Sequence, residues 1–264
     1  MTSPAADAAI ILAVENVAVR FGGLVAISDM NFDVHEGELV SLIGPNGAGK
    51  TTAFNVITGF QKPTNGKVTF RGTALNGLKP HAVTALGLVR TFQRTSVFDR
   101  ISVFDNVLIG LHRRTNPSLW GTLLGFSKER KAEAELRDRA WEILELVGID
   151  HQAGEIGGSL PYGDQRLLGV ALALAADPSA LLLDEPVSGM NASETGRFVD
   201  LLNRLRKRGM TILLVEHDMP MVMGISDRII VLNYGRIIAN GPPSEIQSNP
   251  AVIKAYLGGG IKHA

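Results

Sequence analysis

The chain has 264 residues, with 26 Lys plus Arg balanced by 26 Asp plus Glu, so it carries no net charge that would hold a nucleic acid or an anionic membrane. It contains no cysteine, which excludes disulfides, thiolate zinc sites and cysteine nucleophiles. Hydrophobic residues make up 45%, enough for a sizeable core, yet no apolar run approaches the roughly 20 residues that a membrane-spanning helix needs.

The first nine residues are small and polar and include no basic residue. The apolar stretch Ala8–Val14 is too short for a secretory signal and lacks the right flanks. We therefore expect a disordered tail over residues 1–9 and a cytoplasmic protein.

Short β-type runs separated by turn residues open the chain, and apolar runs of four or five residues return in its last third. The predicted strands are Leu12–Arg20, Met30–Val34, Glu38–Ile43, Gly66–Phe70, Ala180–Leu183, Thr211–Val215 and Ile229–Leu232.

Apolar residues at three- and four-residue spacing predict four helices, at Val103–Leu111, Glu129–Val147, Leu160–Ala175 and Asn191–Arg208. Strands and helices alternate as a parallel α/β core requires. We expect residues 10–92 and 177–264 to form this core and residues 93–176 to form a mainly helical part beside it. The irregular stretch Arg113–Phe126 is the expected mobile loop.

The strongest motif lies between an apolar strand and a helical run, and it fits the phosphate-loop pattern G-x-x-x-x-G-K-[ST]. Its residues are Gly44, Pro45, Asn46, Gly47, Ala48, Gly49, Lys50 and Thr51, followed by Thr52. Glycines let successive N–H groups point at phosphate oxygens, the lysine neutralises them, and the Thr51 hydroxyl suits Mg²⁺. The motif predicts a nucleoside triphosphate site.

A second motif is the apolar strand Leu181–Leu183, which ends in Asp184 and Glu185. Without further context, two acidic residues at the end of a strand are usually solvated side chains with no catalytic role. Paired with a phosphate loop, Asp184 suits Mg²⁺, and Glu185 suits orienting or deprotonating an attacking water.

These motifs and those that follow them resemble the nucleotide-binding subunits of ATP-binding-cassette (ABC) transporters over essentially the whole chain. Further matches are Gln93 at the Q-loop, Leu160–Gln165 at the signature, Ser188–Asn191 at the D-loop and His217 near the end. The resemblance implies an α/β fold with a P-loop core, an antiparallel β subdomain and a helical subdomain. It also implies that Gln93 senses Mg²⁺ and water, that His217 contacts the γ-phosphate, and that Phe21 stacks on adenine.

The resemblance narrows to the ATPases of branched-chain amino acid importers, carried by Glu185–Asn191, Glu216–Met219, Val222–Arg228, Leu232–Gly235 and Val252–Gly258. It implies a peripheral subunit on the cytoplasmic face of the inner (plasma) membrane, with ATP and Mg²⁺ as cofactors. Its implied partners are two membrane permeases, a second similar ATPase and, indirectly, an extracytoplasmic solute-binding protein.

One segment departs from the family. The signature, usually Leu-Ser-Gly-Gly-Gln, reads Leu160, Pro161, Tyr162, Gly163 and Asp164. Pro161 replaces the serine whose hydroxyl would meet the γ-phosphate bound by the opposite subunit. A heterodimer with one slow site is one interpretation, and a harmless variant at a permissive helix start is the other.

Several other functions stay open. The same cassette could serve a urea, amide or lipid transport system, because the ATPase does not touch the solute. A soluble ABC ATPase acting on ribosomes or DNA would be expected to carry tandem cassettes or basic extensions, and no nucleic acid partner is expected here. A GTPase is disfavoured because no Asn-Lys-x-Asp occurs.

Overall fold

The computed structural model describes residues 8–91, 97–112 and 127–257. The chain forms two compact units. The first unit consists of Met1–Arg90, Ser179–Glu185 and Leu205–Ala264, and the second of Thr91–Pro178 and Pro186–Arg204. The subdomain boundaries expected from the sequence stay a prediction.

One sheet of ten strands lies within the described part of the first unit, in the order β5-β4-β1-β2-β10-β9-β3-β8-β7-β6. The strands are β1 (Ile10–Phe21), β2 (Leu24–His35), β3 (Leu39–Ile43), β4 (Asn65–Phe70), β5 (Thr73–Ala74), β6 (Leu88–Arg90), β7 (Ala180–Asp184), β8 (Thr211–Val215), β9 (Arg228–Asn233) and β10 (Arg236–Gly241).

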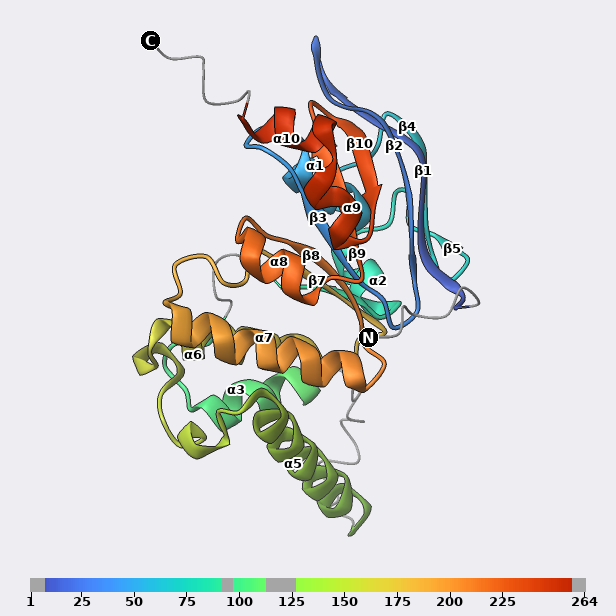
Figure 1. Cartoon of the computed structure of the whole chain (residues 1–264). Helices are drawn as coiled ribbons and strands as arrows, with labels where there is room; N and C mark the ends of the chain where they lie inside the picture. Colours follow the sequence, from blue (N-terminus) through green and yellow to red (C-terminus); the bar gives the residue numbers. More distant parts are fainter. Residues whose placement is uncertain (1–7, 92–96, 113–126, 258–264) are drawn as a thin grey trace. The chain divides into compact units, whose positions relative to one another are not determined.

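The sheet has an antiparallel part and a parallel part (Figure 1). Strands β5, β4, β1 and β2 pair antiparallel, whereas β9, β3, β8, β7 and β6 pair parallel. Strand β10 forms an antiparallel hairpin with β9 and meets β2 at a single paired position, Arg236 with Asp29. The expected parallel core and antiparallel β part are both confirmed.

The parallel strands β3, β7 and β8 are buried at every position. Strands of this kind read as continuous apolar runs because both of their faces are covered. The main core cluster joins residues of both parts of the sheet, among them Met30 and Phe32 of β2, Leu42 of β3 and Phe54 of the first helix. Apolar packing therefore spans the weakly paired β2–β10 junction.

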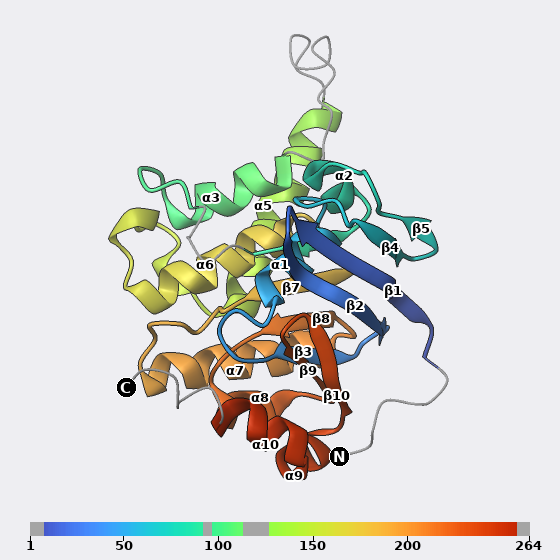
Figure 2. The same ribbon diagram turned by 90° about the horizontal axis from the view of Figure 1, so that it is seen from above.

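The helices of the first unit are short: α1 (Lys50–Ile57), α2 (Pro80–Ala85), α8 (Met219–Ile225), α9 (Pro243–Ser248) and α10 (Pro250–Leu257). Helices α9 and α10 lie beside β10 (Figures 1 and 2). Val252 of α10 packs with Ile43, the last residue of β3, in a second apolar cluster.

The second unit is helical where the structure describes it. Its helices α3 (Val103–His112), α5 (Ser127–Val147) and α6 (Tyr162–Ala175) pack on one another (Figure 2). It also contains the 3-10 turns η1 (Asp150–Gln152) and η2 (Gly157–Ser159) and most of α7 (Ala192–Lys207). The expectation of a mainly helical part is confirmed, whereas its boundaries stay a prediction.

The structure differs from the sequence prediction at several element ends. Strand β2 begins at Leu24, six residues earlier than expected, and the first residues of the added part are largely exposed. Helix α6 begins at Tyr162, since Leu160 and Pro161 have extended backbones, as the residue before a proline favours. The expected loop 113–126 lies outside the described residues.

Membrane-spanning helices are absent from the described ranges, since no helix there combines the required length with the required apolarity.

Candidate functional site

The phosphate loop connects β3 to α1, as the motif predicts. Its three glycines, Gly44, Gly47 and Gly49, all have positive φ, at 155°, 78° and 107°. A Cβ on Gly49 would lie 2.9 Å from the carbonyl oxygen of Ala26, and one on Gly44 would collide with the carbonyl of Leu232. Side chains are therefore excluded at positions 44 and 49 of the loop.

The loop ends at Gly49, which is the N-cap of α1, so Lys50, Thr51 and Thr52 form the first turn of that helix. Backbone N–H groups in a first helical turn have no partner within the helix. Together with the helix dipole they make a site for an anion. The local geometry is that of a phosphate cradle.

Lys50 is buried, and its ammonium group donates to the carbonyl oxygens of Gly44 at 2.7 Å and Pro45 at 3.1 Å. Burial lowers the pKa of Lys50 below its ordinary value of 10.5, while the charges of Glu185 and Asp184 act in the opposite direction. The structure thus brings the predicted lysine close to both predicted carboxylates.

The remaining groups reach the same edge of the sheet by topology. Strand β8 pairs with β3 on one side and β7 on the other, all parallel. The carboxyl ends of parallel strands share one edge, which is the usual ligand edge in such sheets. The phosphate loop after β3, His217 after β8 and the acidic pair at the end of β7 therefore converge.

Glu185 and His217 are in direct contact, with Glu185 Oε1 2.8 Å from His217 Nε2. The backbone N–H of Glu185 donates to the Val215 carbonyl at 2.8 Å, and its φ is 47°. A non-glycine residue in the left-handed region costs about 1–2 kcal/mol, and such strain is concentrated at functional sites. The backbone of Glu185 is therefore strained, as is that of four other described non-glycine residues, and its role in catalysis stays a prediction.

Asp184 is buried at the end of β7, and Arg90 Nη2 donates to its Oδ2 at 2.5 Å. The oxygen donors expected to meet a cation are this carboxylate and the Thr51 hydroxyl. No cluster of three or more His, Cys, Asp or Glu side chains suited to a metal occurs in the part of the chain that is described. Mg²⁺ characteristically takes one or two protein carboxylates and completes its shell with phosphate and water, so this sparse, hard donor set fits it.

Phe21 and Gln93 are the other residues predicted for this site. Phe21 is half exposed at the end of β1, where it pairs with Leu24 in the β1–β2 hairpin. Gln93 lies outside the described residues. Arg90 is a residue that the sequence reasoning missed: it stands three positions before Gln93, and only its contact with Asp184 points to a role.

The signature segment belongs to the second unit. Pro161 is the N-cap of α6 rather than its first helical residue, so it provides no side-chain acceptor for the first turn. Leu160, Gly163 and Asp164 are buried, whereas Pro161 and Tyr162 are exposed. Asp164 accepts from Gln152 at 3.0 Å and pairs with Arg197 at 2.8 Å.

Tyr162 connects α6 to the segment after the acidic pair. Its hydroxyl donates to the Ser188 carbonyl at 3.0 Å and accepts from Arg166, whose guanidinium lies 5.0 Å from the tyrosine ring centre. A Cβ on Gly189 would lie 3.3 Å from the same ring. The signature and the predicted D-loop are therefore held together by this side chain.

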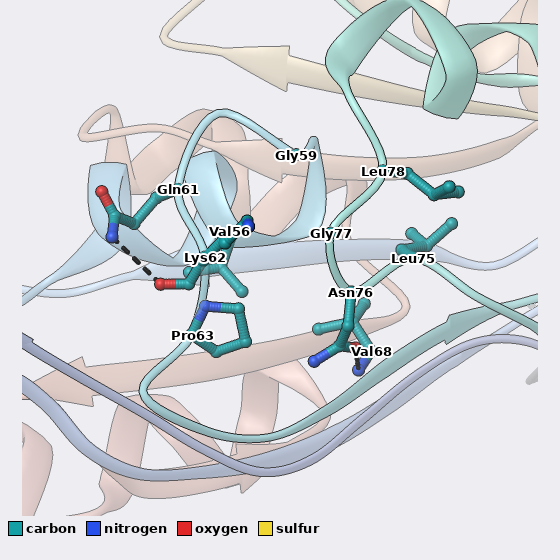
Figure 3. A pocket seen from close by; sticks show the side chains of 10 residues that line it. All are labelled: Val56, Gly59, Gln61, Lys62, Pro63, Val68, Leu75, Asn76, Gly77 and Leu78. Atoms are coloured by element: carbon teal, nitrogen blue, oxygen red, sulfur yellow. Dashed lines mark hydrogen bonds between the residues drawn. The ribbon is translucent and has the colours of Figure 1, made fainter.

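A small pocket in the first unit lies between the segment after α1 and the β4–β5 region (Figure 3). Its walls include Val56, Gly59, Leu75 and Leu78, and the Gln61 amide donates to the Lys62 carbonyl at its margin. None of the phosphate loop, the acidic pair or His217 lines it, so it is not the predicted nucleotide site.

Comparisons with known proteins agree with this geometry. The family model described as ABC transporter matches residues 27–188, and that described as branched-chain amino acid ATP-binding cassette transporter matches residues 236–262.

The chain is 47% identical to the high-affinity branched-chain amino acid transport ATP-binding protein LivG of Salmonella typhimurium, over 94% of this chain and 98% of that protein. It is 43% identical to the corresponding protein BraF of Pseudomonas aeruginosa, with the same coverage. Among solved structures, a nucleotide-free ATP-binding cassette from an ABC transporter matches with a TM-score of 0.80 and 31% identity, covering 94% of this chain and 99% of that one. The ADP conformation of another ATP-binding cassette of an ABC transporter matches with a TM-score of 0.82 and 29% identity, covering 95% of this chain and 99% of that one.

Proposed function

Since the chain belongs to the ATP-binding family of ABC transporters, we propose that it is the ATP-hydrolysing subunit that powers import of branched-chain or related amino acids. The observation that supports this most is the convergence of Lys50, Glu185 and His217 at one edge of the sheet. A cassette fold alone would leave the chemistry open, whereas these three groups provide a phosphate countercharge, a base and its partner.

The phosphate loop, residues 44–49 with the first turn of α1, binds the triphosphate of ATP. Lys50 leaves the carbonyls of Gly44 and Pro45 to neutralise the β- and γ-oxygens, which bear more charge than a peptide carbonyl. Phe21 stacks on the adenine ring from the exposed end of β1.

Mg²⁺, when bound, neutralises developing charge on the phosphate oxygens. Thr51 and Asp184 are the described residues that would hold it, and by resemblance Gln93 joins them. Their oxygen donors are the type this cation prefers.

Hydrolysis then needs a positioned water. Glu185 accepts a proton from this water as its oxygen attacks the γ-phosphorus, and the bond to the β–γ bridging oxygen breaks, giving ADP and phosphate. His217 holds the Glu185 carboxylate, from which it lies 2.8 Å away, and contacts the γ-phosphate.

The subunit works at the cytoplasmic face of the inner (plasma) membrane, bound to two permease subunits and a second, similar ATPase. An extracytoplasmic solute-binding protein supplies the solute to the permeases. Support comes from the relatives, which are named as transport ATP-binding proteins, and from a similar cassette solved as a dimer, with a TM-score of 0.72 and 26% identity.

The signature of this chain, Leu160–Asp164, acts on the nucleotide of the partner ATPase. With Pro161 at the N-cap of α6, it offers backbone N–H groups and the helix dipole but no hydroxyl. A heterodimer whose partner carries an intact signature therefore has one slow site and one fast site, the fast one using Lys50 and Glu185 of this chain.

The Glu185→Gln variant tests this proposal. It keeps the size and hydrogen-bonding reach of the side chain but removes the base, so ATP turnover falls by about 100-fold or more while ATP still binds. The variant is purified from solubilised native membranes with ATP and Mg²⁺, and its partners are identified by mass spectrometry.

Two permeases together with a second ATPase would support the importer, and uptake assays with its solute-binding protein would separate branched-chain amino acids from urea, amides or lipids. Ribosomal or DNA-repair partners would contradict the transport role. Turnover near the wild-type rate would contradict Glu185 as the base.

A further inference from the structure

Arg90, the last residue of β6, is partly buried, with 8% of its side chain exposed, and it is connected to two separate elements. Its Nη2 donates to Asp184 Oδ2 at 2.5 Å, and its Nη1 donates to Asn55 Oδ1 at 2.8 Å and Thr58 Oγ1 at 3.3 Å. One end of the guanidinium therefore holds the acidic end of β7, and the other end holds helix α1.

Two aromatic rings flank this guanidinium. Its central carbon lies 5.5 Å from the ring centre of Phe54 and 5.9 Å from that of Phe60. Cation–π contacts and the low local dielectric strengthen the charged hydrogen bonds and fix the plane of the group. Arg90 is thus confined to one orientation.

The same helix α1 begins with Lys50 and Thr51, so Arg90 ties the element that carries Thr51 to the carboxylate of Asp184. Only the planar fork of arginine can hold both sides at once, since a lysine ammonium is a point donor on a flexible stem. With Oδ2 engaged by Arg90, Oδ1 is the Asp184 oxygen available to a cation.

The fold alone does not require an arginine here. A buried ion pair stabilises a protein little compared with apolar packing, and β6 otherwise consists of Leu88 and Val89. We infer that Arg90 is a positioning residue, which sets the placement of Asp184 relative to Thr51 and so determines how well the ATP site takes up a divalent cation. This inference rests on the proposed function, in which these two residues meet Mg²⁺.

The test measures ATP affinity of the full-length chain by calorimetry, first in EDTA and then across a Mg²⁺ titration. In Arg90→Lys the charge remains but the fork is lost. We expect ATP affinity in EDTA to stay within about threefold of wild type, and the Mg²⁺ concentration for half-maximal effect to rise at least about tenfold, as changes behind metal ligands commonly do.

Two further variants sharpen the test. Asn55→Ala leaves the Arg90–Asp184 pair in place but removes the strongest anchor on α1, so it should shift the Mg²⁺ dependence in the same direction by a smaller factor. If Arg90→Lys fails to fold, Asn55→Ala alone still tests the inference. Arg71→Lys is the matched control, because Arg71 is an exposed arginine of the same unit that contacts Glu36 and Ser179, and it should change neither quantity.

An unchanged Mg²⁺ dependence in Arg90→Lys and Asn55→Ala would overturn the inference while leaving the proposed function standing. An equal loss of ATP affinity with and without Mg²⁺ would also overturn it, since that result indicates a general structural role. A wild-type chain that binds no ATP under either condition would overturn the proposed function, and the inference with it.

Discussion

Lys50 is a buried cation whose partners in this structure are neutral carbonyls. Its ammonium group is 2.7 Å from the Gly44 oxygen and 3.1 Å from the Pro45 oxygen, within reach of the Asp184 and Glu185 charges. Burial makes such a charge unfavourable and so lowers the pKa of Lys50. An incoming phosphate therefore meets a cation that is only partly compensated.

We expect Lys50→Ala to weaken ATP binding by about 10- to 100-fold, because a charge-assisted hydrogen bond contributes about 1.5–3 kcal/mol. Calorimetric titration with ATP gives the affinity directly. Lys62→Ala, which removes an exposed lysine from the same unit, is the control and should leave the affinity unchanged. Equal affinities for Lys50→Ala and wild type would show that the loop binds phosphate through its backbone alone.

At the scale of single elements, α6 begins without a side-chain cap because its N-cap is Pro161. The first helical hydrogen bond is nevertheless made, from the Gln165 N–H to the Pro161 carbonyl at 3.0 Å. A proline is compatible with the extended backbone at this position, with φ −52° and ψ 150°. The helix thus forms normally, and what it lacks is a hydroxyl at its start.

Pro161→Ser should have two separable effects. A serine N-cap stabilises a helix by about 0.5–2 kcal/mol, so the thermal midpoint of the chain should rise. In the proposed heterodimer the new hydroxyl should also raise ATP turnover, since it would add a donor to the phosphate bound by the second ATPase.

The control is Lys79→Ser, which places the same cap on α2, a helix that also lacks one. It should raise stability without changing turnover. If Pro161→Ser matches Lys79→Ser in both measurements, the slow-site hypothesis is wrong and Pro161 is a harmless variant.

At the scale of the whole first unit, one ion pair links strands that are distant in sequence. Arg228 of β9 donates to both carboxylate oxygens of Glu38, at 2.7 and 2.8 Å, and to the backbone carbonyl of Asp33 in β2 at 2.8 Å. Burial alone would raise the pKa of Glu38, but the bonds from Arg228 and the His35 backbone outweigh it and lower the pKa below 4.5.

A lowered carboxyl pKa stabilises the fold above the pKa of the unfolded chain, and that stabilisation is lost as the pH falls through the pKa of the folded state. We expect Glu38→Gln to cost about 2–4 kcal/mol of unfolding free energy at pH 7, since it leaves Arg228 with only the longer 3.5 Å charged contact to the Asp33 carboxylate. The difference in unfolding free energy between the variant and the wild type should narrow below pH 4.5. Denaturant titrations across this range measure it, and Glu36→Gln, at an exposed neighbouring acid, should show neither effect. A gap that stays constant with pH would contradict this account.

The sequence predicted those parts of the molecule that depend on local pattern. The phosphate loop, the buried strands and the acidic pair follow from residue spacing, and the helical regions follow from apolar periodicity. Strand β10 and helices α8, α9 and α10 were missed because they are short and only partly buried, so that their apolar pattern is weak.

Long-range contacts could not be predicted. Arg90 meets Asn55 and Asp184, which lie 35 and 94 positions away, and no local rule couples such residues. The contact of Glu185 with His217 was likewise invisible, although the order of the motifs placed both residues in the same family site.

The junction of β2 and β10 has a consequence for temperature. The two parts of the sheet share a single backbone pairing, Arg236 with Asp29, so the apolar cluster around Met30 and Phe32 does most of the joining. Apolar association weakens on cooling, whereas backbone hydrogen bonds do not depend on it in the same way. We therefore expect the joint between the two parts of the sheet to lose stability on cooling sooner than the strand pairs within each part.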